Sequence, residues 1–520
     1  MLLNIPASIV SEQEIITFEG KRYTYSHLLE KTGNLAAALK LQGIGKGDRV
    51  GLITTNNPEM VEVFFSAFQL GATIVPINYR AKADEFAFMV EDAGVKALLF
   101  EERYGDILAP LIIKCGIETA ICLDGTHEIA ENYDNFINQP KEAKNDHEEV
   151  DPDEIAILLY TSGTTSHPKG VMITHGQITS YVMNHTEVAD GTDRGASLVS
   201  IPGYHVAGVT SLLNSIFNGK RLILMRQFNA EEWLEILEKE KANHAFLVPT
   251  MLKQTIDHPN FETTDLSSLE NLSYGAAPMP LKVIEEAIKL FPKTTNFANA
   301  FGMTETTSTV SVLGPEDHKL DGTPEENKIA LNRLTSVGKP VPGVEIMILD
   351  DDSQKIEEVN VEGHVYVRTS RSMKGYWNRD EETKDTLVDG WVNTEDRGWI
   401  DEDGYLFLGG RNSDMIIRGG ENISPAEIED VLLAHSEISD VAVIGVPSLE
   451  WGEEIMAIIV AKNPDNPLSS EAVTEFCRSK LASFKRPAKI NFSKELPRNS
   501  TGKILKKDLL EQFILENEVK

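Results

Sequence analysis

The chain has 520 residues, more than one hydrophobic core normally serves, so we expect several domain-sized units. Hydrophobic residues make up 41% of it, an ordinary fraction for a globular protein. The formal net charge of −32 argues against DNA, RNA or anionic lipid as a main partner, since these polyanions need a basic surface.

The N-terminal segment predicts neither export nor a membrane anchor. Residues 1–20 include acidic side chains and lack a basic region followed by a long apolar one, so we expect no signal peptide. No apolar run reaches the length of a membrane span. Cys115, Cys122 and Cys477 have no metal-site spacing and are odd in number, which fits a reducing cytoplasm. We therefore expect a cytoplasmic protein without stable membrane insertion.

Helix-like and strand-like segments alternate through the N-terminal part. This alternation predicts an α/β fold of helix-covered parallel sheets. A more β-rich subdomain is expected around 346–349 and 364–368. The first expected elements are a helix over 26–42, a strand over 49–54, a helix over 58–70 and a strand over 72–77.

A loop rich in hydroxyls and glycines spans 160–170 and follows an apolar segment, 155–159, that is typical of a buried strand. Glycines let backbone N–H groups approach phosphate oxygens, hydroxyls donate further hydrogen bonds, and Lys169 supplies charge. The pattern therefore predicts a polyphosphate site at the carboxyl end of a strand. It is not the ordinary P-loop, because Pro168 stands where that motif needs glycine and lysine. A flexible surface loop is the alternative.

The loop resembles the phosphate-binding signature of the adenylate-forming superfamily, which includes acyl-CoA synthetases, adenylation domains of peptide synthetases and firefly luciferase. Segment 71–78 resembles the family's early core strand, and four more signatures follow in the family's order, so the resemblance spans about 23–507. It implies ATP and Mg²⁺, with Thr161, Thr164 and Lys169 on the phosphates and Thr161 also near the metal. Ser166 departs from the usual glycine. The other implied nucleotide contacts of the loop are Ser162, Gly163 and Thr165.

Segment 299–305 resembles the family's adenine-and-metal motif. By resemblance, Phe301 stacks on adenine in place of tyrosine, Thr304 contacts the α-phosphate, and Glu305 coordinates Mg²⁺, which prefers oxygen ligands. In isolation such a heptad is more typical of a turn beside a core aromatic, but it follows another match at 273–278. The remaining implied nucleotide contacts are Gly275, Ala276, Ala277, Asn299 and Gly302.

Segment 391–396 resembles the ribose motif. Asp396 is implied to accept hydrogen bonds from both ribose hydroxyls, and Arg411 occupies the expected position of a nearby arginine. Glu395 stands where the family has glycine. The alternative for Asp396 is a turn after a strand.

The most marked domain boundary lies at 409–414, where the family hinges a large domain to a small mobile one. We expect an AMP-binding and acyl-binding domain over 1–412, an α+β domain over 413–520, and Ser413 as the hinge. The C-terminal domain should contain strands over 441–446 and 455–461 and helices over 425–434 and 470–481.

Segment 497–503 resembles the C-terminal catalytic loop, whose lysine bridges the substrate carboxylate and the α-phosphate. That lysine is Lys503 here. A single lysine near a chain end is otherwise usually a surface residue, so the assignment depends on the preceding Thr501 and Gly502 and on the distance from the hinge.

Coenzyme A (CoA) needs a passage for its thiol and a grip on its nucleotide. Gly419 and Gly420 resemble the loop that lines the pantetheine tunnel after the C-terminal domain rotates, and Trp451 resembles another tunnel element. An aromatic ring beside cations suits the nucleotide of CoA, although a solvated helix face is the alternative. The residues in question are Phe484, Lys485 and Arg486.

The family builds its acyl pocket largely from the segment after the phosphate loop, here 202–208. Tyr204, His205 and Gly208 are the implied pocket residues. Relatives that activate amino acids carry an aspartate there, and this segment has no acid, so a fatty or aryl acid is favoured. His205 is a pocket gate by resemblance; the alternative is a hydrogen-bonded core histidine.

The resemblance implies an AMP-forming acyl-CoA ligase that uses ATP, Mg²⁺, CoA and a small carboxylic acid. Forming an acyl adenylate requires a site that neutralises phosphate charge and holds two anions together. One alternative is an acyl-AMP ligase that loads a carrier protein. Another is a non-catalytic nucleotide-binding or scaffold protein, which Lys503, Glu305 and Asp396 argue against. No nucleic acid partner is expected, and a homodimer stays open.

Overall fold

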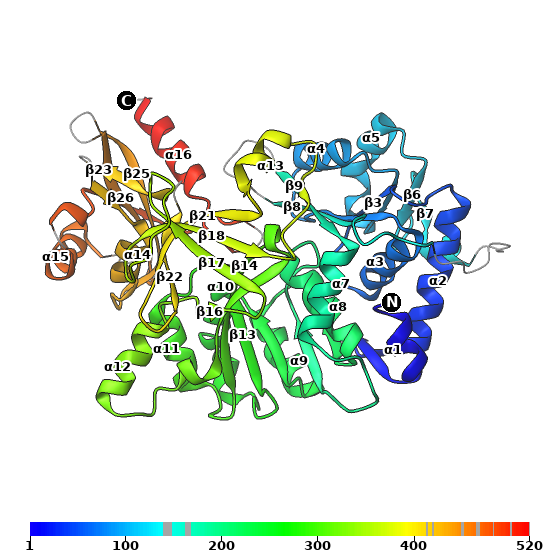
Figure 1. Ribbon diagram of the computed structural model, residues 1–520, viewed down its shortest axis with the longest axis horizontal. Helices are drawn as coiled ribbons and strands as arrows, with labels where there is room; N and C mark the ends of the chain where they lie inside the picture. The colour runs from blue at the N-terminus through cyan, green and yellow to red at the C-terminus, as the bar shows by residue number, and fades with distance from the viewer. Residues whose placement is uncertain are drawn as a thin grey trace.

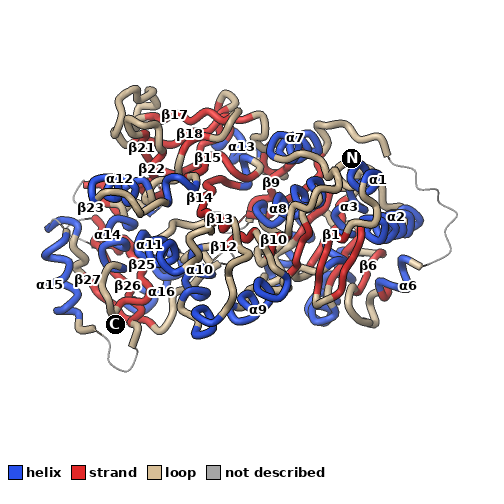
Figure 2. Tube along the Cα trace, turned by 90° about the horizontal axis from the view of Figure 1, so that it is seen from below, coloured by secondary structure: helices blue, strands red, loops and turns tan. Residues whose placement is uncertain are grey.

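The computed structural model describes residues 1–138, 148–161, 168–411, 414–418, 421–448, 452–463, 468–481, 483–499 and 502–518. The chain is α/β, with mixed sheets in a large N-terminal domain and a small α+β C-terminal domain (Figure 1). This confirms the predicted fold class. Viewed from below, α15 and β27 lie at one end of the molecule, and α1 and α2 lie at the other (Figure 2).

Sheet I has the strand order β19-β9-β8-β4-β3-β5-β6-β7 and is parallel from β8 to β7. β9 folds back antiparallel on β8, and β19, from much later in the chain, pairs with β9. Its strands are β3 (Arg49–Ile53), β4 (Thr73–Pro76), β5 (Ala97–Phe100), β6 (Thr119–Cys122), β7 (Glu131–Asn132), β8 (Ile155–Thr161), β9 (Lys169–Thr174) and β19 (Gly375–Tyr376).

Sheet II has the order β16-β15-β14-β13-β12-β10-β11-β1-β2 and is parallel from β14 to β1. Its strands are β1 (Glu14–Phe18), β2 (Lys21–Thr24), β10 (Ala196–Val199), β11 (Arg221–Leu224), β12 (His244–Leu247), β13 (Asn271–Gly275), β14 (Asn296–Met303), β15 (Ser308–Leu313) and β16 (Lys339–Pro340).

Two smaller sheets follow. Sheet III is antiparallel, in the order β17-β18-β21-β20 with β22 paired to β21, and sheet IV has the order β24-β23-β26-β25 with β27 paired to β26. Their strands are β17 (Val344–Leu349), β18 (Gly363–Thr369), β20 (Leu387–Val388), β21 (Trp391–Ile400), β22 (Leu406–Arg411), β23 (Ile416–Arg418), β24 (Glu421–Ile423), β25 (Ile438–Ser448), β26 (Gly452–Ala461) and β27 (Lys489–Ser493).

Helices cover these sheets. Among the described residues, no helix combines the length and the apolar character needed to cross a bilayer. The helices are α1 (Asn4–Ile9), α2 (Tyr25–Leu41), α3 (Pro58–Leu70), α4 (Ala83–Ala93), α5 (Gly105–Cys115), α6 (Tyr133–Ile137), α7 (His175–His185), α8 (Val206–Asn218), α9 (Ala230–Glu240), α10 (Pro249–Ile256), α11 (Leu281–Leu290), α12 (Pro324–Arg333), α13 (Asp380–Thr386), α14 (Pro425–Leu433), α15 (Ser470–Lys480) and α16 (Lys506–Glu518).

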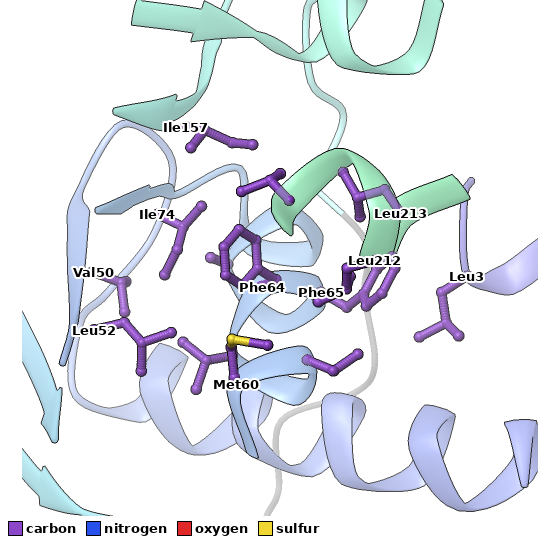
Figure 3. Close-up of a cluster of buried hydrophobic side chains, with 14 of the residues drawn as sticks. Leu3, Val50, Leu52, Met60, Phe64, Phe65, Ile74, Ile157, Leu212 and Leu213 are labelled. Atoms are coloured by element: carbon purple, nitrogen blue, oxygen red, sulfur yellow. The ribbon is translucent and has the colours of Figure 1, made fainter. Parts of the chain in front are cut away.

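The largest core cluster lies around α3, between sheet I and α8. Figure 3 shows Phe64 and Phe65 of α3 between Ile74 of β4 on one side and Leu212 and Leu213 of α8 on the other. All five side chains are buried. This shared core fixes sheet I relative to α8, and therefore the phosphate-loop region relative to the segment that precedes α8.

The predicted elements are confirmed to within a few residues, with two differences. β22 covers Leu406–Arg411, so the expected boundary segment 409–414 starts inside this strand. Asp396 lies within β21, so the alternative of a turn after a strand is wrong.

Candidate active site

Thr161 ends β8 and Lys169 begins β9, and the two are partners in the antiparallel register. The Thr161 hydroxyl donates to the Lys169 carbonyl over 3.4 Å. Residues 162–167, with the other predicted contacts of the phosphate loop, lie outside the described residues. The strand pairing therefore places two candidate phosphate contacts together at the base of that loop.

Tyr376 contacts both the phosphate-loop lysine and the candidate metal ligand. The Nζ atom of Lys169 lies over the Tyr376 ring, 4.6 Å from its centroid. The Tyr376 hydroxyl donates a 2.9 Å hydrogen bond to Oε1 of Glu305. Lys169 and Glu305 are both buried. Burial and the Glu305 carboxylate raise the pKa of Tyr376, so its hydroxyl stays protonated and remains a donor.

Tyr376 was not predicted from the sequence, because it lies outside every recognised motif. The structure places it there through β19, where Tyr376 pairs with Val171 of β9. The backbone N–H of Trp377 donates to Gly170 over 2.7 Å, and its indole N–H donates to the Asp92 carbonyl over 2.9 Å. The segment is thus anchored to both β9 and α4.

The Glu305 loop is a tight backbone turn between β14 and β15. A Cβ at Gly302 would lie 2.1 Å from the Ser308 carbonyl oxygen, so this position requires glycine. Thr307 and Ser308 have φ of 50° and 86°, in the left-handed region. The Glu305 carbonyl accepts a 2.7 Å hydrogen bond from the Met373 N–H. Thr304, the predicted α-phosphate contact, is half-buried at the start of this turn.

The other predicted adenine-site residues lie on β13, directly after it, and on β14. A Cβ at Gly275 would lie 2.2 Å from the Ala300 carbonyl, so the two strands approach closely, and Ala276 follows with φ of 66°. Ala277 is half-buried. Asn299 is buried and its side-chain amide donates to the Ser336 carbonyl over 3.5 Å.

Phe301 is consistent with both interpretations of its motif, a core aromatic and a ring that stacks on adenine. Its ring packs against the hydrophobic cluster of Val310, Val344 and neighbouring residues, as a core aromatic would. It is nevertheless only half-buried, so part of the ring is accessible. It lies at the irregular register step of β14 and β15, one residue before Gly302.

Asp396 is 9% exposed and lies opposite Arg411 in the register of β21 and β22. Its backbone N–H donates to the Thr394 hydroxyl over 3.1 Å. The Arg411 side chain lies outside what the structure describes. Glu395 has φ of 61°, a left-handed value that explains why glycine suits this position.

Tyr204 and His205 lie at the start of α8, with ring centroids 4.4 Å apart. Burial, together with the positive charge of Arg80, lowers the pKa of His205 to about 3, so this imidazole is neutral at physiological pH. A Cβ at Gly208 would lie 2.2 Å from the Pro202 carbonyl oxygen, so only glycine fits this turn.

The loop that carries Lys503 docks on the N-terminal domain. A Cβ at Gly502 would lie 2.8 Å from Oγ1 of Thr250, the second residue of α10. Because α10 follows β12, this contact lies on the carboxyl edge of sheet II, where β13 and β14 also end. Asn499 and Lys503 close the loop, since the Lys503 N–H donates to Asn499 Oδ1 over 2.9 Å. Lys503 is half-buried.

The candidate CoA-binding residues are only partly described. The Lys485 ammonium is paired with Glu427, 2.6 Å from Oε2, and Arg486 donates to the Leu481 carbonyl over 2.9 Å. The Phe484 side chain and the whole of Gly419, Gly420, Trp451 and Ser413 lie outside the described residues.

The residues present fit Mg²⁺ bound together with a nucleotide. Among the described residues, no cluster of three or more His, Cys, Asp or Glu could hold a metal alone. Mg²⁺ at nucleotide sites usually takes one or two carboxylates together with phosphates and water. The buried carboxylate of Glu305 matches that donor set, and the hydroxyl of Thr161 adds a further oxygen donor.

A surface groove of about 800 Å³ lies elsewhere, near the starts of β1, β10 and β11. Those starts are at the opposite edge of sheet II from the residues described above. The groove lining contains none of the predicted site residues, so its volume does not measure the candidate active site.

The family described as AMP-binding enzyme matches residues 7–377, and its C-terminal domain matches 427–503. A long-chain-fatty-acid–CoA ligase of Mycobacterium tuberculosis, FadD13, is 35% identical over 95% of this chain and 93% of its own length. A fatty acid–[acyl-carrier-protein] ligase of Streptomyces coeruleorubidus, ScoC, is 32% identical over 95% and 92%. The structure of Bacillus subtilis o-succinylbenzoate CoA synthetase with its acyl-adenylate has a TM-score of 0.83 and 29% identity, covering 98% of this chain and 97% of that one.

Proposed function

This chain belongs to the AMP-binding enzyme family, and we propose that it activates a fatty or aryl acid with ATP and transfers the acyl group to CoA. The observation that carries the proposal is the contact of Tyr376 with both Lys169 and Glu305. It joins a buried ammonium and a buried carboxylate beside a glycine- and hydroxyl-rich loop. A phosphate chain with a bound cation needs both charges.

In the first step, a carboxylate oxygen of the acid forms a bond to the α-phosphorus of ATP, and the bond to pyrophosphate breaks. Lys169 and Lys503 would offset the charge of the phosphates and of the attacking carboxylate. Asp396 would orient the ribose. When bound, Mg²⁺ neutralises phosphate charge, and Glu305 and Thr161 would hold it.

In the second step, the CoA thiol attacks the acyl carbon and AMP leaves. We propose that the C-terminal domain, 413–520, rotates about Ser413 between the two steps. The docked Gly502 loop supports this proposal, because it represents one arrangement of the two domains, with Lys503 at the carboxyl edge of sheet II. The loop around Gly419 would replace it in the second arrangement.

The acid is proposed to be fatty or aryl because the pocket segment, 202–208, has no acidic side chain that could pair with the ammonium group of an amino acid. His205 has a lowered pKa and is neutral, and Tyr204 beside it is aromatic. FadD13 is named for long-chain fatty acids, which supports an apolar acyl chain. The three cysteines carry free thiols, which supports the cytoplasm as the compartment.

Loading of a carrier protein is the second candidate, because ScoC is named as a fatty acid–[acyl-carrier-protein] ligase. In that case the acyl adenylate would form normally, but free CoA would not accept the acyl group.

The decisive experiment is a screen of AMP release with and without CoA, across acetate, medium and long fatty acids, benzoates and dicarboxylates. We expect AMP release that depends on CoA for a fatty or aryl acid, with the CoA thioester as product. Adenylate formation without thioester would favour the carrier-protein role. If none of the acids supports exchange between ATP and pyrophosphate, both candidate functions are rejected.

A further inference from the structure

Tyr376 uses two different parts of its side chain for its two contacts. Its hydroxyl donates to Oε1 of Glu305, and the face of its ring carries the Lys169 ammonium. Glu305 comes from the turn after β14 of sheet II, whereas Lys169 begins β9 of sheet I. Tyr376 therefore connects charged groups from two sheets.

We propose that Tyr376 is a positioning residue that sets the Glu305 carboxylate for Mg²⁺ and the Lys169 ammonium for the phosphates of ATP. The proposal rests on the proposed function. It adds a residue from a third segment of the chain to the nucleotide site.

The first argument is that Tyr376 is itself held firmly. Its backbone pairs with Val171 in β19 and β9, and its N–H donates to the Thr383 hydroxyl over 2.8 Å. Tyr376 is only 4% exposed as a whole residue, so its ring has little room to move. A hydroxyl fixed in this way determines the direction of one carboxylate oxygen of Glu305.

The second argument concerns charge. Lys169 and Glu305 are oppositely charged and both buried, so each charge needs a stabilising contact in the folded protein. The Tyr376 ring lies against the ammonium and its hydroxyl against the carboxylate, so it stabilises each charge separately. Tyr376 thus contacts the ammonium through its ring and the carboxylate through its hydroxyl.

The two contacts can be tested separately by substitution. Tyr376→Phe keeps the ring beside Lys169 and removes the hydroxyl, whereas Tyr376→Leu removes both. The matched control is Tyr133→Phe, which also removes a tyrosine hydroxyl from a buried carboxylate, that of Glu62 between α6 and α3.

The measurement is calorimetric binding of a non-hydrolysable ATP analogue, first in EDTA and then across a Mg²⁺ titration. For Tyr376→Phe we expect the half-saturating Mg²⁺ concentration to rise about tenfold or more, because loss of a hydrogen bond to a ligating carboxylate usually weakens metal binding by that factor. Affinity in EDTA should stay close to wild type. Tyr376→Leu should also weaken binding in EDTA, and Tyr133→Phe should change neither.

Each outcome has one meaning. A Tyr376→Phe titration that overlays the wild-type curve overturns the inference, and so does an equal shift in Tyr133→Phe. If the wild-type protein itself binds the analogue neither with nor without Mg²⁺, the proposed function fails instead. Thermal unfolding of each variant checks the fold, and if Tyr376→Leu is unfolded, Tyr376→Phe alone decides.

Discussion

Gly502 and Thr250 touch across the two domains: a Cβ at residue 502 would lie 2.8 Å from Thr250 Oγ1, and Gly502 has φ of 81°. Gly502→Ala should therefore hinder docking of the Lys503 loop. A left-handed alanine costs about 1–3 kcal/mol, which corresponds to a fall of roughly 5- to 150-fold in adenylation rate. The assay is acid-dependent ATP–pyrophosphate exchange.

The double variant Gly502→Ala, Thr250→Ala separates the two causes of that loss. It removes the steric contact and leaves the backbone strain, so exchange should recover in part. Normal exchange in the single variant would mean that this contact does not matter for adenylation.

Lys503→Ala should slow adenylate formation severely and spare thioester formation from supplied acyl-AMP. The lysine is proposed to touch only the first transition state, and loss of one charged donor there should lower the rate by about 10² to 10³. Rates of the two half-reactions, measured separately, provide the check. Equal losses in both would remove Lys503 from the assigned role.

Asp396→Ala should weaken ATP and AMP binding. The buried carboxylate lies opposite Arg411, and its removal takes away the ribose acceptor, at roughly 2 to 4 kcal/mol of binding free energy. Calorimetry with ATP measures the change, and Glu402→Ala is a control, because this exposed acid lies in the turn after β21. An unchanged affinity would leave Asp396 as a strand residue only.

Local signals made part of the fold predictable. The helix expected over 58–70 matches α3 to the residue, because Asn57 caps its start, Pro58 occupies its first turn and Gly71 ends it in the left-handed region. The phosphate-loop strand and the 299–305 motif could be found for a similar reason, since their residues are contiguous in sequence.

Long-range contacts could not be predicted. β19 spans Gly375–Tyr376 alone, too short for any periodicity, and its position depends on pairing with β9. The approach of Gly502 to Thr250 likewise joins segments that are far apart in the chain. Asp396 was hard to assign to a strand because its neighbour Glu395 has a left-handed backbone conformation, which is more typical of a turn than of a strand interior.

Ser413→Pro should separate the two half-reactions if residue 413 is the hinge. Proline fixes φ near −65° and blocks a large backbone change, so ATP–pyrophosphate exchange should persist while thioester production falls by orders of magnitude. Ser413→Ala is the control and should keep both activities. Joint loss of both half-reactions would indicate a damaged fold, and survival of both would place the hinge elsewhere.

Glu62 should make stability fall as the pH rises from about 4.5 to about 7. It is 4% exposed, and burial raises the pKa of its carboxyl from 4.5 to about 7 despite the hydrogen bond from Tyr133. Between these values the folded protein keeps a proton that the unfolded chain has lost, so this contribution is complete below pH 4.5 and declines up to about pH 7. The whole effect is on the order of 3 kcal/mol.

Glu62→Gln stays uncharged at every pH and should remove this decline. The measurement is the unfolding midpoint between pH 5 and pH 8, compared with wild type and with Glu149→Gln as an exposed control. The unfolding midpoint of Glu62→Gln should rise relative to that of wild type as the pH increases. Only the wild-type protein must then either bury a charged carboxylate or keep this carboxyl protonated above its ordinary pKa, and both lower its stability. Parallel curves for all three proteins would show that Glu62 titrates normally.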